Sequence, residues 1–505
     1  MKVDNAIILA AGMCTRFKPL SFVYPKALLR VKGEVLIERQ IRQLKEARIN
    51  NIYIVVGYMA DRFSYLKDKY GVTLLLNKEY ESRNNHSSIY VAKEYIRNSY
   101  ICVSDNYYTK NPFSANEDES YYTVSYAKGP TDEWCVSTDD KGYISSVTVG
   151  GHDSFFMYGH AFWDENFSSN FLKILDKVYA EPETKNKYWE DIFVDNIGLL
   201  EMKTKILNED SVLEFDRLED LRKFDPNAVR INSVKPGMTN ATYLYEVNND
   251  SYIIRIPDSV SNALTNRKQE AIIYKEMSKL NISDELLYID ANTGIKITKY
   301  IKNARLCNPT SKSDISLCMN YLKKVHAINI PSVEYVDLFK MISYYESLLG
   351  ENTVEYADYN EVKENVFNLE SFVSATKKEI CLTHIDAVAD NFLICEDEKN
   401  GSTLKLIDWE YAGLQDPDVD VAMFCLYSLF DRKKIDDTID IYFDNGCTTS
   451  DRMKIYAYIA IGGLLWSNWC EYKKLHGITF GEYAYRQYDY ARTYSKTVLE
   501  YLKLI

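Results

Sequence analysis

Two sets of residues, far apart in the chain, have types and spacings suited to phosphate chemistry. In the second half, His384, Asp386 and Asn391 precede Asp408, which stands in the segment Leu-Ile-Asp-Trp-Glu. In kinase-like sites, the first Asp of this pattern accepts the proton of a substrate hydroxyl, and the Asn and the later Asp hold magnesium. The pattern therefore indicates phosphoryl transfer, and His384 is expected to orient the loop rather than to transfer a proton.

The other set lies near the N-terminus, in Leu-Ala-Ala-Gly-Met-Cys-Thr-Arg at residues 9 to 16. Small residues let backbone N–H groups approach phosphate oxygens, and Arg16 adds a forked donor. Lys26 can supply a second cation, and Asp105, at a predicted strand end, can bind a metal ion. Each feature alone also fits an ordinary turn or cap. Together they predict a second phosphate site, with a nucleotide-binding backbone at Ala10, Ala11 and Gly12.

Further nucleotide contacts are predicted in both halves. Asn85, Ser87 and Ser88 are candidate nucleotide contacts, although Ser-Ser before an apolar helix is equally typical of a helix cap. Arg255, in the strand-like segment Ile-Ile-Arg-Ile, is expected to contact ATP phosphates, and Glu270 on the next helix is expected to hold it. The alternative for Arg255 is a solvated strand residue.

The elements that must position these residues follow from the hydrophobic pattern. Apolar runs at 3–9, 52–56, 72–76 and 101–103 predict buried parallel strands, and residues 36–47 and 87–96 have helical spacing. This alternation predicts a Rossmann-like α/β sheet, in which ligands bind beyond the carboxyl ends of the strands. The Ala-Ala-Gly loop and Asp105 both follow such ends.

The pattern changes near residue 225, where Phe-Asp-Pro-Asn signals a turn. Two antiparallel strands then flank a loop at 235–240, and from about residue 311 the pattern is mainly helical, interrupted at 381–410. The sequence therefore predicts two domains: an α/β domain at 1–228, and an α+β domain at 229–505 with a small β-rich lobe and a large helical lobe.

Composition excludes several classes of protein. The 505 residues carry a formal net charge of −13, which disfavours nucleic acid as a partner. Ten cysteines without a Cys-x-x-Cys pair indicate reduced thiols and a cytoplasmic protein. The longest apolar run, 455–466, is shorter than the roughly 20 residues of a membrane span, so no membrane insertion is expected. The apolar start fits a first strand better than a signal peptide.

The first half resembles the nucleotidyltransferases that join nucleoside triphosphates to phosphorylated small molecules, and in particular bacterial CTP:phosphocholine cytidylyltransferases. The resemblance covers essentially residues 1–226, and Cys14 stands where the family usually has Gly. It implies that Asp105 and Asp216 hold Mg²⁺ and that Arg16 and Lys26 stabilise the leaving pyrophosphate. It rests on Leu9-Ala-Ala-Gly-x-x-Thr-Arg16, Pro25-Lys26, Asp105-Asn-Tyr, Glu133-Trp134, Tyr188-Trp189-Glu190-Asp191, Asp195-Asn196 and Glu214-Phe-Asp216.

The second half, about residues 231–500, resembles the choline/ethanolamine kinase family and, more distantly, aminoglycoside phosphotransferases. The resemblance rests on Gly237-Met-Thr-Asn240, Thr383-His-Ile-Asp386, Asn391, Leu406-Ile-Asp-Trp-Glu-Tyr-Ala412, Asp420, Leu465-Trp-Ser-Asn-Trp469 and Phe480-Gly-Glu-Tyr-Ala-Tyr485. It implies that Asp386 is catalytic and that Asn391 and Asp408 hold the metal.

The end of the second half bears on the substrate. Trp466 and Trp469 are three residues apart and share a helix face, and with Tyr485 they can form an aromatic cage for a quaternary ammonium, at about 0.5–2 kcal/mol per contact. Without the resemblance, core packing would be the ordinary explanation of this aromatic stripe. Tyr427 stands where the family often has an acidic residue, so choline recognition is expected to rest on aromatic rings.

The two resemblances together predict a bifunctional enzyme. Choline and ATP would give phosphocholine, which with CTP would give CDP-choline for decorating bacterial surface glycans or lipids, with Mg²⁺ as cofactor. A second trimethylammonium pocket is predicted in the first half, although each of its residues could equally be structural. The candidates are Trp134, Tyr188 and Trp189, with Glu190 or Asp191 supplying charge.

Two alternatives remain at this stage. One is a sugar or amino-sugar kinase fused to a sugar-1-phosphate nucleotidyltransferase, which would use hydroxyl-binding polar residues in place of an aromatic cage. The other is a chain in which one half is a non-catalytic regulatory module. The sequence leaves open the choice between choline and ethanolamine, direct transfer of the intermediate between sites, and the oligomeric state.

Overall fold

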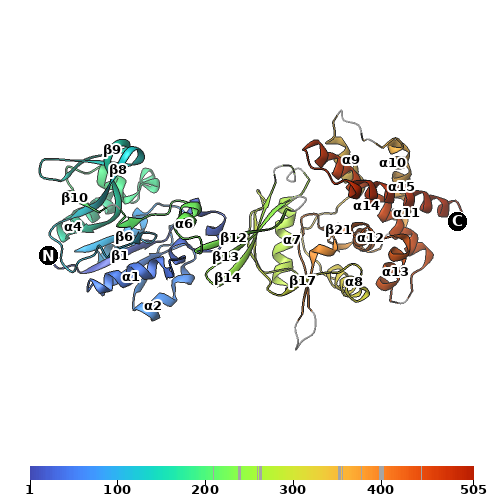
Figure 1. The fold of residues 1–505 in the computed structure, drawn as a ribbon, viewed down its shortest axis with the longest axis horizontal. Coiled ribbons are helices and arrows are strands. Elements are labelled where there is room, and N and C mark those ends of the chain that lie inside the picture. The colour runs from blue at the N-terminus through green and yellow to red at the C-terminus, as the bar shows by residue number, and fades with distance from the viewer. Residues whose placement is uncertain are drawn as a thin grey trace. The chain divides into compact units, whose positions relative to one another are not determined.

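A computed structural model describes residues 1–505 except 209, 237–239, 259, 261–263, 351–353, 355, 377, 397–402, 445 and 505. The chain divides into two compact units (Figure 1). The first consists of residues 1–230 with 246–250, and the second of 231–245 with 251–505. The glycine loop expected at Gly237, Met238 and Thr239 lies outside the described residues.

The first unit is built on a seven-stranded mixed sheet with the order β10-β8-β9-β6-β1-β4-β5. The strands β1, β4, β5 and β6 run parallel to one another, whereas β9 is antiparallel to both β6 and β8. The predicted Rossmann-like mixed sheet is therefore confirmed. The strands are β1 (Asn5–Ala10), β4 (Ile52–Val56), β5 (Thr73–Leu76), β6 (Ser99–Val103), β8 (Tyr121–Thr138), β9 (Ile144–Trp163) and β10 (Lys203–Ile206).

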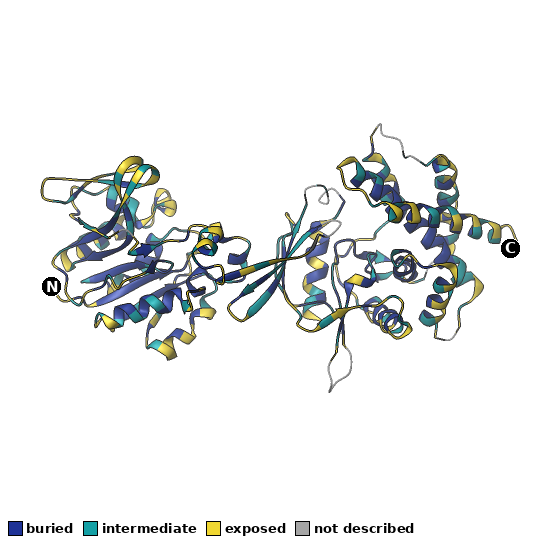
Figure 2. Cartoon of the chain, viewed as in Figure 1, coloured by how far each residue is buried: buried dark blue, intermediate teal, exposed yellow. Residues whose placement is uncertain are grey.

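Both faces of this sheet are covered by hydrophobic clusters. Alternate residues of β1 face opposite sides, so that Ile8 joins one cluster while Ile7 and Leu9 join the other. Every residue of β1 is buried, as expected for a central parallel strand (Figure 2). The helices are α1 (Leu36–Glu46), α2 (Tyr65–Tyr70), α3 (His86–Ala92), α4 (Glu165–Val178), α5 (Trp189–Val194) and α6 (Leu218–Phe224); the short strands are β2 (Arg30–Val31), β3 (Glu34–Val35), β7 (Tyr107–Tyr108) and β11 (Val212–Leu213).

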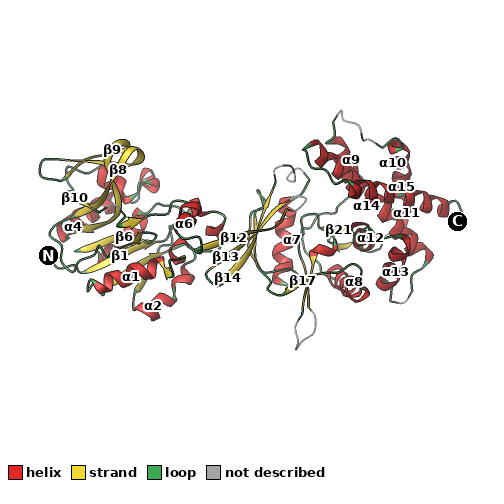
Figure 3. Cartoon of the chain, in the orientation of Figure 1, coloured by secondary structure: helices red, strands yellow, loops and turns green. Residues whose placement is uncertain are grey.

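The second unit begins with a five-stranded sheet in the order β12-β13-β14-β16-β15, followed along the chain by a mainly helical lobe (Figure 3). The helix α7 (Arg267–Lys279) lies between β14 and β15 in the chain. This is the predicted β-rich lobe of a kinase-like domain. Its strands are β12 (Val229–Pro236), β13 (Asn240–Val247), β14 (Asp250–Pro257), β15 (Leu286–Ile289) and β16 (Lys296–Lys299).

The helical lobe is centred on α14 (Thr449–Leu475), whose residues from Ile455 to Cys470 are all buried. Gly463 lets α15 (Glu482–Leu502) approach closely, because a Cβ there would lie 2.5 Å from the carbonyl oxygen of Gln487. Over the described residues, neither α14, at 27 residues, nor any other helix combines the length and apolar character needed to span a bilayer.

The other elements of this lobe include the two strands, β18 and β21, that flank the kinase-like motif. The helices are α8 (Lys312–His326), α9 (Leu338–Ser347), α10 (Tyr359–Phe367), α11 (Glu370–Ala375), α12 (Asp418–Tyr427) and α13 (Arg432–Tyr442). The strands are β17 (Ala304–Leu306), β18 (Cys381–Thr383), β19 (Phe392–Cys395), β20 (Thr403–Leu406) and β21 (Gly413–Gln415).

Candidate active sites

A cavity of about 540 Å³ in the first unit collects residues that the sequence separates by 200 positions. It includes the ends of β1 and β6, where a doubly wound sheet binds ligands. The predicted nucleotide, phosphate and metal residues of this half all line it. They are Ala10, Ala11, Gly12, Arg16, Lys26, Asn85, Ser87, Ser88, Asp105 and Asp216.

Cations and carboxylates are paired inside this cavity. The Lys26 ammonium lies 2.8 Å from the Asp105 carboxylate, and Arg16 forms an ion pair with Asp216. Burial opposes the charge on Lys26, but Asp105 outweighs it and raises the Lys26 pKa. Burial and Asp105 also raise the pKa of Glu214 to about 7. Glu214 belongs to the quoted Glu-Phe-Asp motif, but sequence analysis assigned it no role in the cavity.

The loop after β1 holds Cys14 in a backbone conformation that favours glycine, the residue usual here in the proteins that the first half resembles. Cys14 has a φ of 52°, in the left-handed region that glycine adopts without steric cost. Burial and the nearby Asp105 carboxylate raise the pKa of its thiol to about 12. The side chain therefore adds an uncharged group to the cavity wall and leaves the charge balance of the phosphate loop unchanged.

The serine pair is held by a residue that sequence analysis missed. Asn77, directly after β5, donates its amide to Ser87 Oγ at 2.8 Å and to Ser88 Oγ at 3.1 Å. Ser87 Oγ in turn donates to the carbonyl of Asn84 at 2.7 Å. A polar residue immediately after a buried strand is the sequence signal that could have indicated Asn77.

Two of the candidates for a trimethylammonium pocket lie together at the cavity. Tyr188 lines it and is 46% exposed, and the ring of Trp134 stands perpendicular to that of Tyr188 with 6.1 Å between the centroids. Glu133 precedes Trp134 in the chain, and burial together with Asp216 raises its pKa. Two aromatic faces at the wall of a cavity suit a methylated cation.

The other three candidates have structural surroundings. Trp189 is in the hydrophobic core, 5.0 Å from the ring of Trp163, so its indole is not available to a ligand. The Asp191 carboxylate accepts from the Tyr188 backbone N–H at 2.6 Å and caps α5. Glu190 accepts from Asn85 at 3.0 Å, and burial raises its pKa to about 7. Trp189 therefore serves in packing and Asp191 in capping, whereas Glu190 holds Asn85 of the cavity wall.

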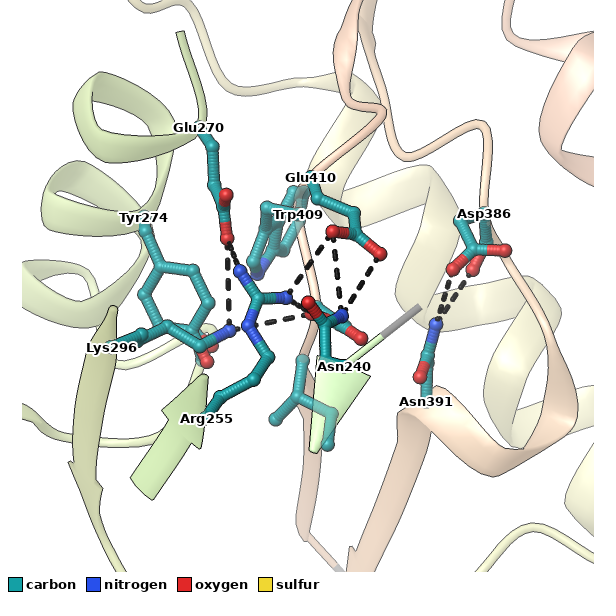
Figure 4. Close-up of polar contacts among 12 residues, drawn as sticks. Asn240, Arg255, Glu270, Tyr274, Lys296, Asp386, Asn391, Trp409 and Glu410 are labelled. Atoms are coloured by element: carbon teal, nitrogen blue, oxygen red, sulfur yellow. Dashed lines mark hydrogen bonds and ion pairs between the residues drawn. The ribbon is translucent and has the colours of Figure 1, made fainter. Parts of the chain in front are cut away.

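In the second unit, the predicted catalytic loop follows β18 and brings Asn391 against Asp386, as Figure 4 shows. Asn391 donates its amide to the Asp386 carbonyl at 2.9 Å and to the Asp386 carboxylate at 3.1 Å. Burial, and then the charge of Glu410, raise the pKa of Asp386 to about 7. A carboxylate with a raised pKa is a better proton acceptor, which suits the predicted general base.

Asp420 holds the backbone of the catalytic loop in place. Its carboxylate accepts from the backbone N–H groups of His384 at 2.9 Å and Ile385 at 2.7 Å. Burial lowers the pKa of His384 to about 4, so its ring is neutral near pH 7, and Nε2 lies 3.0 Å from the carbonyl oxygen of Ile407. These contacts fit the expected orienting role of His384.

Six charged side chains, here named the ion cluster, meet where the β-rich lobe faces Asp408. Arg255 forms ion pairs with Glu270, as predicted, and also with Asp408. Sequence analysis assigned no role to the other three members. Arg267 and Lys296 occupy ordinary helix and strand positions, and Glu410 was quoted only as part of the Leu-Ile-Asp-Trp-Glu motif. The members are Arg255, Arg267, Glu270, Lys296, Asp408 and Glu410.

The predicted magnesium ligands have suitable chemistry. Asn391 uses its amide nitrogen on Asp386, which leaves its side-chain oxygen for a metal ion, and Asp408 provides a carboxylate. Asp408 has a φ of 72°, in the left-handed region, which Asp adopts more readily than most non-glycine residues. The described residues contain no group of three or more His, Cys, Asp or Glu side chains arranged for a metal. Mg²⁺ commonly binds one or two protein carboxylates together with substrate phosphates, so this donor set fits it.

An aromatic cluster adjoins Asp386. Trp466 and Trp469, with 3% and 4% exposure, have ring centroids 6.2 Å apart. The Trp466 ring also lies 5.1 Å from Tyr411 and 5.4 Å from Tyr427. The Tyr427 phenol lies close to Asp386, where it offsets part of the rise in pKa that burial causes.

The third predicted ring of the cage lies elsewhere. Tyr485 is 52% exposed on α15, where it interacts with Arg492. Phe480, five residues earlier, instead packs 5.0 Å from Trp469. The aromatic cluster, which reaches Asp386 through Tyr427, therefore includes Trp466, Trp469, Tyr411 and Phe480.

Comparison with known proteins agrees with both halves. The choline/ethanolamine kinase family model matches residues 231–444, and the MobA-like NTP transferase domain matches residues 6–105. Choline-phosphate cytidylyltransferase of Streptococcus pneumoniae is 39% identical over 221 residues, which are 44% of this chain and 96% of that protein. 2-Aminoethylphosphonate cytidylyltransferase of Lancefieldella rimae is 32% identical over 225 residues, 44% of this chain and 92% of that protein.

A solved structure also matches the second unit. The choline kinase LicA of Streptococcus pneumoniae is 28% identical, covers 53% of this chain and 93% of its own, and has a TM-score of 0.46. Fold and site define a nucleotidyltransferase joined to a kinase-like phosphotransferase. The chain belongs to the choline-phosphate cytidylyltransferase family through its first unit and carries a choline/ethanolamine kinase domain in its second, which confirms the resemblances.

The different surroundings of two tryptophans predict different mutational effects. Trp189→Ala should lower the free energy of unfolding of the first unit by about 3–5 kcal/mol, because it removes a large buried side chain. Trp134→Ala should change it by less than about 1 kcal/mol, since Trp134 is only partly buried. Urea unfolding, followed through the loss of nucleotidyltransferase activity, measures both. Equal destabilisation by the two variants would contradict the assignment of Trp189 to the core.

Proposed function

We propose that the second unit phosphorylates choline with ATP and that the first unit couples the resulting phosphocholine to CTP, giving CDP-choline and pyrophosphate. The observation that carries this proposal is the aromatic cluster beside Asp386, in a domain of the choline/ethanolamine kinase family. The relationship of the first unit to choline-phosphate cytidylyltransferase supports the second step, since that reaction consumes the product of the first.

In the kinase reaction, the choline hydroxyl attacks the γ-phosphorus of ATP, and its proton passes to the Asp386 carboxylate while ADP leaves. Arg255 places its guanidinium on the nucleotide phosphates. Asn391 and Asp408 would hold Mg²⁺, which neutralises the phosphate charge. A trimethylammonium group cannot donate a hydrogen bond, so the faces of Trp466 and its aromatic neighbours supply its recognition.

In the cytidylyltransferase reaction, a phosphate oxygen of phosphocholine attacks the α-phosphorus of CTP in line with the departing pyrophosphate. Positioning and charge neutralisation provide most of the catalysis in such transfers. Lys26 and Arg16 stabilise the pyrophosphate, and Asp105 and Asp216 would hold Mg²⁺. The ring pair of Trp134 and Tyr188 is the proposed contact for the methylated ammonium.

The product would serve as the donor for phosphocholine on surface glycans or lipids, and both reactions are placed in the cytoplasm, where ATP and CTP are made. The sugar-pathway alternative is less well supported, because the groups around Trp466 are aromatic rings rather than paired hydroxyl-binding side chains. A regulatory role for one half is also disfavoured, since both candidate sites keep their carboxylates.

Two substitutions should separate the reactions. Asp386→Asn removes the proton acceptor and should lower phosphocholine formation by about 100-fold or more. CDP-choline synthesis from supplied phosphocholine should stay within about twofold, because Asp386 is in the other unit. Asp105→Asn should have the reverse effect. Mass spectrometry of reactions containing ATP, CTP, Mg²⁺ and choline or phosphocholine measures each product.

The same assay includes its controls. Parallel reactions with ethanolamine, 2-aminoethylphosphonate and an amino sugar test whether choline and phosphocholine are the preferred substrates. If either single variant lost both reactions while keeping the wild-type circular dichroism spectrum, independent active sites would be excluded. Preference for the amino sugar would instead support the sugar-pathway alternative.

The aromatic cluster gives a separate prediction. Trp466→Ala should raise the KM for choline by about 2- to 30-fold, corresponding to roughly 0.5–2 kcal/mol of cation–π attraction, with a smaller change for ATP. Trp466→Phe keeps an aromatic face and should retain most of the affinity. Steady-state kinetics with each substrate varied in turn measures both constants. An unchanged choline KM in a folded Trp466→Ala protein would assign Trp466 to packing alone.

A further inference from the structure

Lys296 on β16 lies directly opposite Arg255 on the antiparallel strand β14. Residues paired in this way project from the same face of a sheet, with side chains close together. Both of these side chains are buried. Like charges in directly opposed positions destabilise a sheet, and a buried cation is costly without anionic partners. The pair therefore needs anions on this face.

The described contacts of Lys296 are with the acidic part of the ion cluster. Its ammonium lies 3.4 Å from Asp408 and 4.0 Å from Glu270, and it stands 3.9 Å from the ring centroid of Tyr274 (Figure 4). Arg255 is paired with the same two carboxylates. Both cations consequently depend on Asp408, which is also a proposed metal ligand.

Metal binding changes the charge balance of the ion cluster. The cluster holds three cations, Arg255, Arg267 and Lys296, and three carboxylates, Glu270, Asp408 and Glu410. If Asp408 bound a metal ion, the three cations of the cluster would share its two other carboxylates, Glu270 and Glu410. The cations released from Asp408 would then be available to nucleotide phosphates.

We propose that Lys296 is a second phosphate-binding cation of the kinase unit, which together with Arg255 holds the β- and γ-phosphates of ATP while Asp408 binds the metal. This inference rests on the proposed kinase function. Bound phosphates would supply the missing negative charge.

The test is a series of ligands that differ only in their phosphates. Calorimetry on the full chain, with Mg²⁺, measures the affinity of Lys296→Met and of the wild type for adenosine, AMP, ADP and ATP. A phosphate-binding role predicts that ATP and ADP bind about 10-fold or more weakly to the variant, and adenosine within about twofold. An equal loss for all four ligands, or no loss for any, would overturn the proposal.

Two variants and one internal reaction act as controls. Lys279→Met makes the same change at an exposed position on α7 and should leave all four affinities unchanged. Lys296→Arg keeps the charge and should recover most of the affinity for ATP. CDP-choline synthesis from phosphocholine, carried out by the first unit of the same polypeptide, should be unaffected. If Lys296→Met does not fold, Lys296→Gln, which keeps a polar side chain of similar length, decides by the same series.

The series also separates this inference from the proposed function. A chain that binds ATP through Lys296 but does not phosphorylate choline would contradict the substrate while supporting Lys296. In a chain that does phosphorylate choline, the role of Lys296 requires that the KM for ATP rise in Lys296→Met while the KM for choline stays within about twofold. An equal rise in the KM values for ATP and for choline would instead indicate a structural role for Lys296.

Discussion

Both candidate sites depend on partly buried carboxylates that neutralise buried cations. Asp408 is paired with Arg255 and Lys296, and Asp105 is paired with Lys26. Removing such charges from water costs several kcal/mol per ion unless each has a partner. A nucleotide bound with a metal ion would supply both signs of charge. Its phosphates could bind the cations and the metal ion could bind the carboxylates, so that no buried charge would be left without a partner. The folds serve to hold the pairs at strand ends and on facing strands.

The sequence was sufficient to predict contacts between residues whose types suit one reaction and whose spacing in the chain is short or set by the strand order. Asp386 and Asn391 are joined by a tight loop, so their five-residue separation already fixes their contact. The parallel strands β1 and β6 were predicted from continuous apolar runs, and their carboxyl ends necessarily lie at one edge of the sheet. The Ala-Ala-Gly loop and Asp105 had to converge for that reason.

The sequence was insufficient to predict which of two neighbouring aromatic residues faces a site, because tertiary packing determines this. Tyr188 and Trp189 are adjacent aromatic residues at the start of a six-residue helix, too short for periodicity to show which faces the core. The structure turns Trp189 inward and Tyr188 toward the cavity. Likewise, Tyr411 reaches Trp466 from a different element, whereas Tyr485 of the expected cage points elsewhere. Such contacts between distant segments have no signature in one sequence.

The two aromatic sites differ in burial in a way that the proposed substrates explain. Choline offers only a hydroxyl and a methylated cation, so its selection must come from the rings themselves, and Trp466 and Trp469 are almost completely buried. Phosphocholine also carries a phosphate that Lys26, Arg16 and a metal can hold. The half-exposed pair of Trp134 and Tyr188 then needs to contribute only part of the binding energy. Cation–π attraction is weaker at exposed positions. The phosphate of phosphocholine compensates for this, because its contacts supply the rest of the binding energy.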